Sequence, residues 1–352
     1  MYSIEDYNYI LPEELIAQEP VAERDQSRLL TLDRQSGKLS HHVFNELDTL
    51  LNPSDVLVIN NTRVVPGRLM GKKETGGRVE ILIVNYATGN QSPSHSKQFD
   101  CLIKASKPAR VGTRLYFPEN VQATVVDRID EYTHRLRFSH KGEFAEILEK
   151  IGKTPLPPYI KRDRRQPSRK DRTAYQTIYA SRNGAIAAPT AGFHFTEQLM
   201  TRIKRKGIQV AEITLHVGYG TFLPVRADDI RSHQMHSEWF DIPEETASMV
   251  THAKNEGKRI VAVGTTAVRT LEFAADESGK VRPGVGDCDL YIYPGYEFRV
   301  VDAMVTNFHL PKSTLLMLVS AFAGRENILS AYQAAIQERY RFYSYGDAMI
   351  IY

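Results

Sequence analysis

Residues 259–275, RIVAVGTTAVRTLEFAA, decide the fold class of this chain. Arg259–Val263 is a short apolar run typical of a buried strand, and Thr266–Ala275 carries apolar residues at helical spacing. Gly264–Thr266 joins the two segments, so a strand turns directly into a helix. A strand that leads into a helix in this way is typical of α/β proteins.

The same alternation of helices and strands continues through the C-terminal half of the sequence. Thr196 is suited to cap the N-terminus of a helix, and Gly207 to end that helix. We predict helices over residues 197–206, 244–257, 313–323 and 327–341, and strands over 208–215 and 290–293. These elements favour a largely parallel or mixed sheet. We expect the N-terminal stretch, which has a periodic segment at 12–18, to join the same domain.

Residues 60–150 have a different character. Short runs rich in β-branched and aromatic residues alternate there with turn formers such as Gly76-Gly77. Strands at this spacing, with no helical pattern between them, favour a small antiparallel barrel or sandwich. The predicted strands cover residues 55–59, 78–85, 99–103, 114–117, 123–128 and 135–139, and a short helix covers 143–151. We therefore predict an α/β main domain of residues 1–58 and 153–352, with an inserted β-rich domain of residues 59–152.

The composition indicates a soluble cytoplasmic protein. The 352 residues are 42% hydrophobic, which is enough for two cores, and the formal net charge is only +3. The two cysteines, Cys101 and Cys288, are far apart in the sequence, which argues against a disulfide framework or a cysteine-based zinc site. The N-terminal residues lack the pattern of a signal peptide. The longest strongly apolar run, Thr314–Ala323, is too short to span a bilayer.

Residues 184–196, GAIAAPTAGFHFT, are built unlike ordinary core or surface. Small residues allow a backbone to approach another molecule closely, while Thr190 and His194 place a hydroxyl and an imidazole in an apolar segment. This pattern fits a wall of a ligand pocket. It fits equally a tightly packed strand and turn whose histidine is a satisfied core residue.

Two stretches place polar groups just after predicted strands. Residues 216–222, HVGYGTF, form a glycine-rich turn that presents His216 and Tyr219, but they lack the spacing of a dinucleotide-binding loop. Gly264–Thr266 opens a helix that carries Arg269, and a helix N-terminus with free amides suits an anion or a carboxylate. Alternatively, a threonine there only caps the helix, and Arg269 pairs with Glu272 one turn later.

Residues 307–314, NFHLPKST, end at another predicted helix start. Asn307, His309 and Lys312 would bring a donor, a titratable group and a positive charge to one place. Taken alone, Lys312 fits a solvated surface position just as well.

His233 and His236 form an HxxH pair, which requires a check for a metal site. Zinc sites normally use three or four ligands at recognisable spacing. Glu238 is near in sequence, but the pattern of a zinc protease helix is missing. We therefore predict no metal site.

The strongest charge feature is residues 161–172, KRDRRQPSRKDR. Clusters of lysine and arginine neutralise phosphates, and the nearby Tyr175 could stack on a base or a ribose. A solvated linker that leaves the β-rich block is the alternative, and the two roles are compatible. Arg63 and Arg68 lie at the other end of that block, where the chain crosses between the domains.

Ten stretches of this sequence, taken together, resemble one family: the S-adenosylmethionine:tRNA ribosyltransferase-isomerases of queuosine biosynthesis. They run in order along nearly the whole chain. The stretches are INNTRVVPGRL at 59–69, PLPPYIKR at 155–162, YQTIYA at 175–180, AAPTAGFHFT at 187–196, TLHVGYGTF at 214–222, MHSE at 235–238, VGTTAVRTLE at 263–272, YIYPGYEF at 291–298, TNFHLPKSTLLMLVSAFAG at 306–324 and YRFYSYGDAM at 340–349.

The resemblance implies a mixed-sheet α/β domain with an inserted small antiparallel β-barrel domain. It also implies the reaction. The ribosyl part of S-adenosylmethionine moves onto the aminomethyl group of a 7-deazaguanine at the tRNA wobble position and rearranges to an epoxycyclopentanediol. Adenine and methionine leave, so S-adenosylmethionine is a consumed co-substrate and we expect no other cofactor. We expect a monomer with tRNA and S-adenosylmethionine as its partners and no attachment to a membrane.

This chemistry needs a base that removes a proton next to the sulfonium. The candidates are His194, His216, His309 and Glu238. Expected substrate-binding residues are Thr190, Gly192, Phe193, Tyr219, Gly220, Thr221, Gly264, Thr265, Thr266, Arg269, Asn307 and Lys312. Expected tRNA-binding residues are Arg63, Arg68, Lys161, Arg162, Arg164, Arg165 and Tyr175. Two other functions remain open: a tRNA-binding module without chemistry, and a tRNA methyltransferase.

Overall fold

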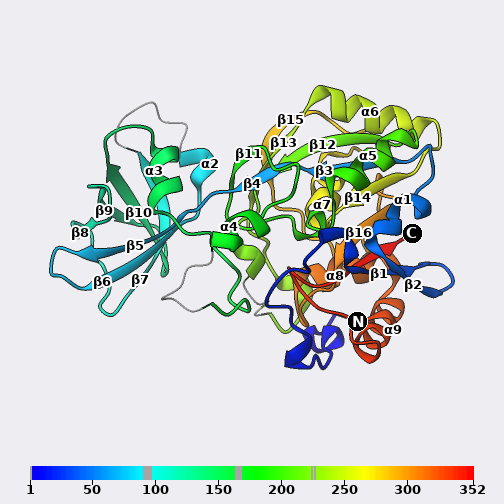
Figure 1. The fold of residues 1–352 in the computed structure, drawn as a ribbon, viewed down its shortest axis with the longest axis horizontal. Coiled ribbons are helices and arrows are strands. Elements are labelled where there is room, and N and C mark those ends of the chain that lie inside the picture. Colours follow the sequence, from blue (N-terminus) through cyan, green and yellow to red (C-terminus); the bar gives the residue numbers. More distant parts are fainter. Residues whose placement is uncertain (1, 90–96, 163–168, 223–224, 226) are drawn as a thin grey trace.

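A mixed nine-stranded sheet forms the centre of the larger domain (Figure 1). The structure is a computed structural model that describes residues 2–89, 97–162, 169–222, 225 and 227–352. The strand order is β15-β13-β12-β3-β14-β16-β17-β1-β2. The strands are β1 (Arg28–Leu32), β2 (Leu39–Val43), β3 (Val56–Asn60), β12 (Gln209–Leu215), β13 (Glu238–Ile242), β14 (Ile260–Val263), β15 (Gly284–Cys288), β16 (Ala303–Asn307) and β17 (Ala348–Ile351). Parallel pairs join β12, β3, β14 and β16, and antiparallel pairs flank them, so the predicted mixed-sheet α/β class is confirmed.

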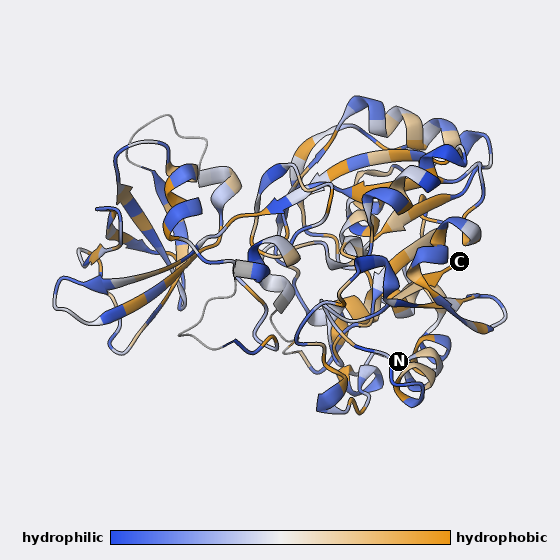
Figure 2. Ribbon diagram, viewed as in Figure 1, coloured by the Kyte–Doolittle hydropathy of each residue, from blue (hydrophilic) through white to orange (hydrophobic). Residues whose placement is uncertain are grey.

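Helices cover both faces of this sheet, because its inner strands are apolar on both sides. Along β3, Val56 and Val58 belong to one core and Leu57 and Ile59 to another. The first core includes side chains of α6 (Glu244–Asn255), α7 (Thr265–Ala274), α8 (Thr314–Ala323) and α9 (Arg325–Gln337). The second includes side chains of α1 (Leu47–Leu50) and α5 (Glu197–Arg205). In Figure 2 the central strands are accordingly orange over most of their length.

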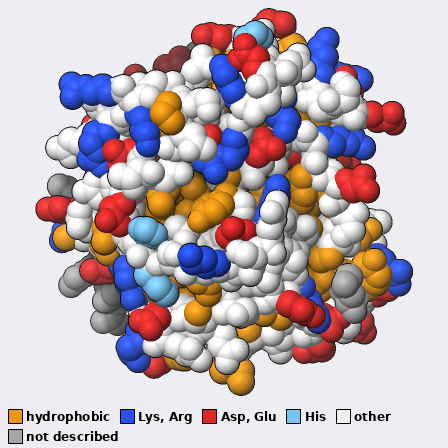
Figure 3. Space-filling view, turned by 90° about the vertical axis from the view of Figure 1, so that its right-hand side faces the viewer, with side chains coloured by type: hydrophobic (Ala, Val, Ile, Leu, Met, Phe, Trp, Pro, Cys, Tyr) orange, Lys and Arg blue, Asp and Glu red, His pale blue; other side chains and the backbone are white. Residues whose placement is uncertain are grey.

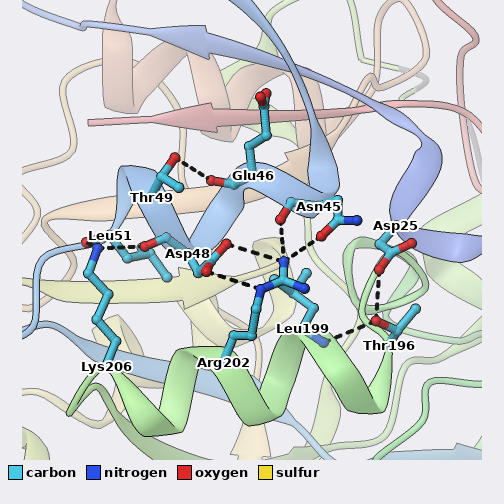
Figure 4. Close-up of polar contacts among 10 residues, drawn as sticks. All are labelled: Asp25, Asn45, Glu46, Asp48, Thr49, Leu51, Thr196, Leu199, Arg202 and Lys206. Carbon is cyan, nitrogen blue, oxygen red and sulfur yellow. Dashed lines mark hydrogen bonds and ion pairs between the residues drawn. The ribbon is translucent and has the colours of Figure 1, made fainter.

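Helix α5 is held at both ends by polar contacts (Figure 4). The Thr196 hydroxyl accepts a hydrogen bond from Leu199 N at 3.1 Å and donates one to Asp25 at 2.9 Å, which confirms the predicted N-cap. Arg202 pairs with Asp48 at 3.2 Å, and Lys206 Nζ donates to the carbonyl oxygens of Asp48 and Leu51. These contacts fix α5, and with it the end of the 184–196 segment, on the α1 side of the sheet.

The smaller domain is a closed antiparallel barrel with the strand order β10-β7-β6-β5-β8-β9. The strands are β5 (Arg68–Lys73), β6 (Arg78–Ile83), β7 (Gln98–Ala105), β8 (Arg114–Tyr116), β9 (Gln122–Arg128) and β10 (Thr133–Ser139). Its core contains Leu69, Ile81, Phe99 and Leu136, and α3 (Phe144–Ile151) adds Phe144. The short helices α2 (Tyr86–Gly89) and α4 (Arg169–Ala174) lie beside the barrel and on the chain that leaves it. The predicted barrel is thus confirmed.

A narrow parallel ribbon of β4 (Thr62–Val64) and β11 (Arg182–Ala185) connects the two domains. Because β3 runs to Asn60 in the central sheet, the chain enters the barrel only after Val64, later than the expected limit at residue 59. The predicted strand at 55–59 belongs to the main sheet and not to the β-rich block.

One other local prediction needs correction. The predicted strand at 290–293 is irregular, and the strand is instead β15, which pairs with β13. The N-terminal hairpin β1–β2 was not anticipated.

On the face of the main domain turned away from the barrel, acidic and basic side chains are interspersed (Figure 3). In the described part of the chain, no helix is long and apolar enough to cross a membrane.

Candidate functional site

A cavity of about 2150 Å³ lies between the barrel and the main domain. Its barrel wall comes from β5, β6, β7 and β10, and the connecting segment 150–162 forms another side. The main-domain wall comes from Gly218–Thr221, from His233 and from Met235–Glu238. Pockets for single small ligands are usually roughly 300–1,000 Å³. This cavity therefore has room for a small molecule and part of a larger partner.

Only some of the predicted site residues reach this cavity. Those that line it are Arg68, Lys161, Arg162, Tyr219, Gly220, Thr221 and Glu238.

Glu238 is joined to Arg269 in a buried ion pair at the main-domain wall. Glu238 Oε2 accepts from Arg269 Nη1, and Oε1 accepts from Gly218 N at 2.8 Å. Arg269 also donates from Nε to Leu290 O at 2.9 Å and from Nη2 to Cys288 O at 3.3 Å. Since both carboxylate oxygens are occupied, Glu238 fixes the Gly218–Thr221 loop and is a poor candidate for a free base. The alternative pair of Arg269 with Glu272 does not form, because Glu272 accepts from the backbone N–H groups of residues 299–301.

His194 is a neutral core histidine with both ring nitrogens hydrogen-bonded. Asn307 Nδ2 donates to Nε2 at 3.1 Å and also contacts Asp347 O at 3.4 Å, so the other nitrogen, Nδ1, donates to Ser27 Oγ at 2.7 Å. Thr190 Oγ1 donates to Asn307 Oδ1 at 2.9 Å. Burial lowers the pKa of His194 to about 3. The predicted role of His194 as a base is not supported by this environment.

His216 and His309 are also held in neutral, buried positions. His216 Nδ1 contacts Thr62 Oγ1 at 2.7 Å, and its ring stacks on Trp239 at 4.8 Å. His309 Nε2 contacts Thr306 Oγ1 at 2.8 Å. Burial lowers the pKa of His216 to about 4 and that of His309 to about 3. Neither ring lines the cavity. Both rings therefore serve to pack and hydrogen-bond the interior of the main domain.

The small residues of segment 184–196 make room for other parts of the same protein. A β-carbon at Gly184 would lie 2.5 Å from the His216 ring, and one at Gly192 would lie 2.1 Å from Tyr179 Oη. Phe193 is buried against Tyr175 and does not reach the cavity. Within this segment only Ile186 lines the cavity. The packed-turn interpretation therefore describes it better than the pocket wall.

The Gly264–Thr266 turn and Lys312 likewise make their contacts with other residues of the same protein. Gly264 has a φ of +88°, which favours glycine, and its N–H donates to Val305 O at 2.7 Å. Thr266 Oγ1 accepts from Asn60 Nδ2 at 3.3 Å, while Thr265 is buried at the start of α7. Lys312 does not line the cavity; it pairs with Glu5 at 2.6 Å and anchors the N-terminal 3₁₀ turn.

Comparison with known proteins identifies the family. A family model described as "Queuosine biosynthesis protein" matches residues 4–351. The chain belongs to the queuosine biosynthesis protein family. It is 50% identical over 348 residues to the S-adenosylmethionine:tRNA ribosyltransferase-isomerase of Syntrophotalea carbinolica, and 51% identical over 349 residues to that of Geotalea uraniireducens. Each alignment covers 99% of both chains. A crystal structure of S-adenosylmethionine tRNA ribosyltransferase from Thermotoga maritima is 37% identical, with a TM-score of 0.56, and covers 99% of this chain and 100% of that chain.

Stretches that carry the resemblance to the queuosine family converge on the cavity. Residues from 59–69, 155–162, 214–222, 235–238 and 306–324 all contribute to its walls. Among them, MHSE at 235–238 is the only stretch whose residues all line the cavity. These segments lie far apart in the sequence, so their meeting point is the best candidate for the active site of this family member.

The predicted tRNA-binding residues have mixed positions. Arg63 is exposed, whereas Arg68 pairs with Glu80 at 3.7 Å and Arg162 pairs with Asp171 at 2.9 Å. Lys161 pairs with Glu13. Arg164 and Arg165 lie outside the described residues. Tyr175 is 0% exposed, so the expectation that its ring stacks on a base is wrong.

Several residues of the cavity do not stand out in the sequence. Lys104, Lys150 and Lys153 line it from β7, from α3 and from the segment that follows. The sequence pattern of His233 and His236 indicates only a candidate pair of metal ligands, yet both residues line the main-domain wall. Among the described residues no group of three or more metal-ligating side chains is found. The MHSE stretch could have revealed His236, because it is short and rich in chemistry-bearing side chains.

Proposed function

We propose that this chain is an S-adenosylmethionine:tRNA ribosyltransferase-isomerase. It transfers the ribosyl moiety of S-adenosylmethionine onto 7-aminomethyl-7-deazaguanine at the wobble position of tRNA. It then isomerises that moiety to give epoxyqueuosine in tRNA, and it releases adenine and methionine. The observation that carries this proposal is the family match over residues 4–351, together with relatives of the same name at about 50% identity over 99% of the chain.

The two walls of the cavity suit two different substrates. On the main-domain wall, Tyr219 offers an aromatic face for adenine or for the cationic sulfonium. On the other side, Lys104, Lys150 and Lys153 offer positive charge for the phosphates of an RNA loop. Arg68, Lys161, Arg162 and Arg172 already pair with carboxylates, which leaves the three lysines as the better phosphate ligands. S-Adenosylmethionine, the ribosyl donor, and the tRNA would therefore meet between the two domains.

S-Adenosylmethionine is consumed as a co-substrate in this proposal, and the reaction uses no metal or other cofactor. Ribosyl transfer and ring rearrangement involve no net redox change, so neither a flavin nor a nicotinamide is needed. We further propose that the protein acts as a monomer in the cytoplasm, where its tRNA substrate is located.

A direct test is to incubate the protein with S-adenosylmethionine and tRNA that carries the aminomethyl deazaguanine. Digestion to nucleosides followed by mass spectrometry should show the gain of the epoxycyclopentanediol, with one adenine and one methionine released for each modified nucleoside. A methyltransferase would instead transfer a labelled methyl group to RNA. A binding module would retain tRNA without releasing adenine. Either of these two results would reject the proposed function.

A further inference from the structure

The reaction needs a base near the donor, and the histidines chosen from the sequence do not supply it. His194, His216 and His309 are buried, hydrogen-bonded and absent from the cavity wall. Glu238 lines the wall, but both of its oxygens are engaged by Gly218 N and Arg269. The proton acceptor must therefore come from another side chain of the cavity.

His236 lies on the main-domain wall, in a position that its contact with Gly220 defines. It is exposed and lines the cavity, and among the described residues none is recorded as a hydrogen-bond partner of its ring. The ring lies directly against the backbone of Gly220: a β-carbon there would lie 2.6 Å from Cδ2 and 2.9 Å from Cγ of His236. The absence of a side chain at Gly220 is what allows the imidazole to lie at this place.

The same two segments also meet at a second point, which lies two residues before Gly220 and two residues after His236. Gly218 N donates to Glu238, and Glu238 is held by Arg269 at the first residue of β13. Thus the Gly218–Thr221 loop and the 235–238 segment meet at two points, one polar and one by close packing. This arrangement holds the His236 ring against the Gly218–Thr221 loop, at an exposed position that lines the cavity.

The other histidines of the cavity are less well placed. The His233 ring is half-buried and packs edge-on against Tyr291 at 5.2 Å. His134 belongs to β10 on the barrel wall, opposite the glycine-rich loop. Neither lies in a stretch that carries the resemblance to the family, whereas His236 does.

We propose that His236 is the general base of the reaction, an inference that rests on the proposed function. It removes a proton from the ribose methylene carbon bonded to the sulfonium. The C–H bond breaks, its electron pair stays on carbon beside the positive sulfur, and the proton forms an N–H bond on the imidazole. An exposed imidazole without a hydrogen-bond partner among the described residues suits this task because it can accept a proton without breaking a hydrogen bond.

The test compares wild-type protein with His236→Gln, His236→Ala and the control His252→Gln. His252 lies on α6, exposed and paired with Glu256, away from the cavity. We expect both His236 variants to lose roughly 10²- to 10⁴-fold in kcat for adenine release, with KM for S-adenosylmethionine changed only a few-fold. The residual activity should show a larger isotope effect with donor deuterated at the ribose methylene, because proton removal becomes rate-limiting. The control should keep wild-type kcat.

A second variant, Gly220→Ala, displaces the ring without removing it and should also lower kcat. Wild-type kcat in His236→Gln and His236→Ala, or a loss confined to KM, would overturn the assignment of the base while leaving the proposed function intact. Failure of the wild-type protein to release adenine would instead reject the proposed function itself.

Discussion

The Arg269 guanidinium and the Glu238 carboxylate form an ion pair in which each side chain is only 5% exposed. Arg269 reaches from the middle of α7 to the first residue of β13, and so ties the helix to the second strand from the edge of the sheet. Glu238 also accepts a hydrogen bond from Gly218 N and thereby holds the loop that lines the cavity. The pair therefore connects the interior of the main domain with the candidate site.

Breaking this ion pair should lower both the stability of the protein and its turnover. Arg269→Gln leaves a buried carboxylate without its cation, and we expect a loss of about 3–5 kcal/mol in the free energy of unfolding. Urea denaturation followed by fluorescence measures it directly, because the only tryptophan, Trp239, neighbours Glu238. The control Lys258→Gln removes a partly exposed surface pair with Glu256 and should change stability by less than about 1 kcal/mol. Equal small effects from both variants would contradict the role given to Arg269.

Stability should fall on acidification because of the buried histidines. The pKa of His194 and that of His309 are lowered from 6.5 to about 3 in the folded protein. The unfolded chain therefore binds more protons below pH 6.5, so the stabilisation is complete above this value and is lost as the pH falls toward 3. On acidification from pH 6.5 to pH 5, each histidine should lower the free energy of unfolding by about 2 kcal/mol.

The measurement for this second prediction is urea denaturation at pH 7.5 and at pH 5. His194→Gln should show a smaller loss on acidification than the wild-type protein, since one of the three buried histidines with a lowered pKa is gone. The exposed His252→Gln should keep the wild-type pH dependence. An unchanged pH dependence in His194→Gln would show that this ring is not held neutral.

Sequence patterns were sufficient for the fold class but not for the site. The strand at 259–263 and the helix after it are visible because local apolar spacing reflects burial. The pairing of β1 with β17 and the irregular path of residues 290–293 depend on partners far away in the sequence, which no local pattern records. His194 looked reactive because it is a polar residue in an apolar segment. Whether such a residue is a free base or a satisfied core group depends on Asn307 and Ser27, and only the folded structure places these beside it.

Gly184 should not tolerate a side chain. Its β-carbon would meet Cε1 and Nε2 of His216 at 2.5 Å, and that ring is already held between Thr62 and Trp239. We expect Gly184→Ala to destabilise the protein by about 1–3 kcal/mol because the ring must shift or the backbone must move. Gly77→Ala is the matched control, since the nearest atom to its β-carbon lies at 4.0 Å. Thermal unfolding should lower Tm clearly in the first variant and little in the second.

Reversing the charge of the barrel-side lysines should weaken tRNA binding in a salt-dependent way. Lys104, Lys150 and Lys153 line the cavity from the side of the barrel, whereas Lys204 is exposed on α5. If each of the three contacts one phosphate, the triple change to Glu should reduce the slope of log K against log salt by roughly 2–3. Filter binding of substrate tRNA at several salt concentrations measures this slope. Lys204→Glu should leave the slope unchanged, because α5 lies on the main domain and is absent from the cavity walls. If the triple variant keeps the wild-type slope, the RNA must approach from another side, and the division of the cavity between donor and tRNA would have to be abandoned.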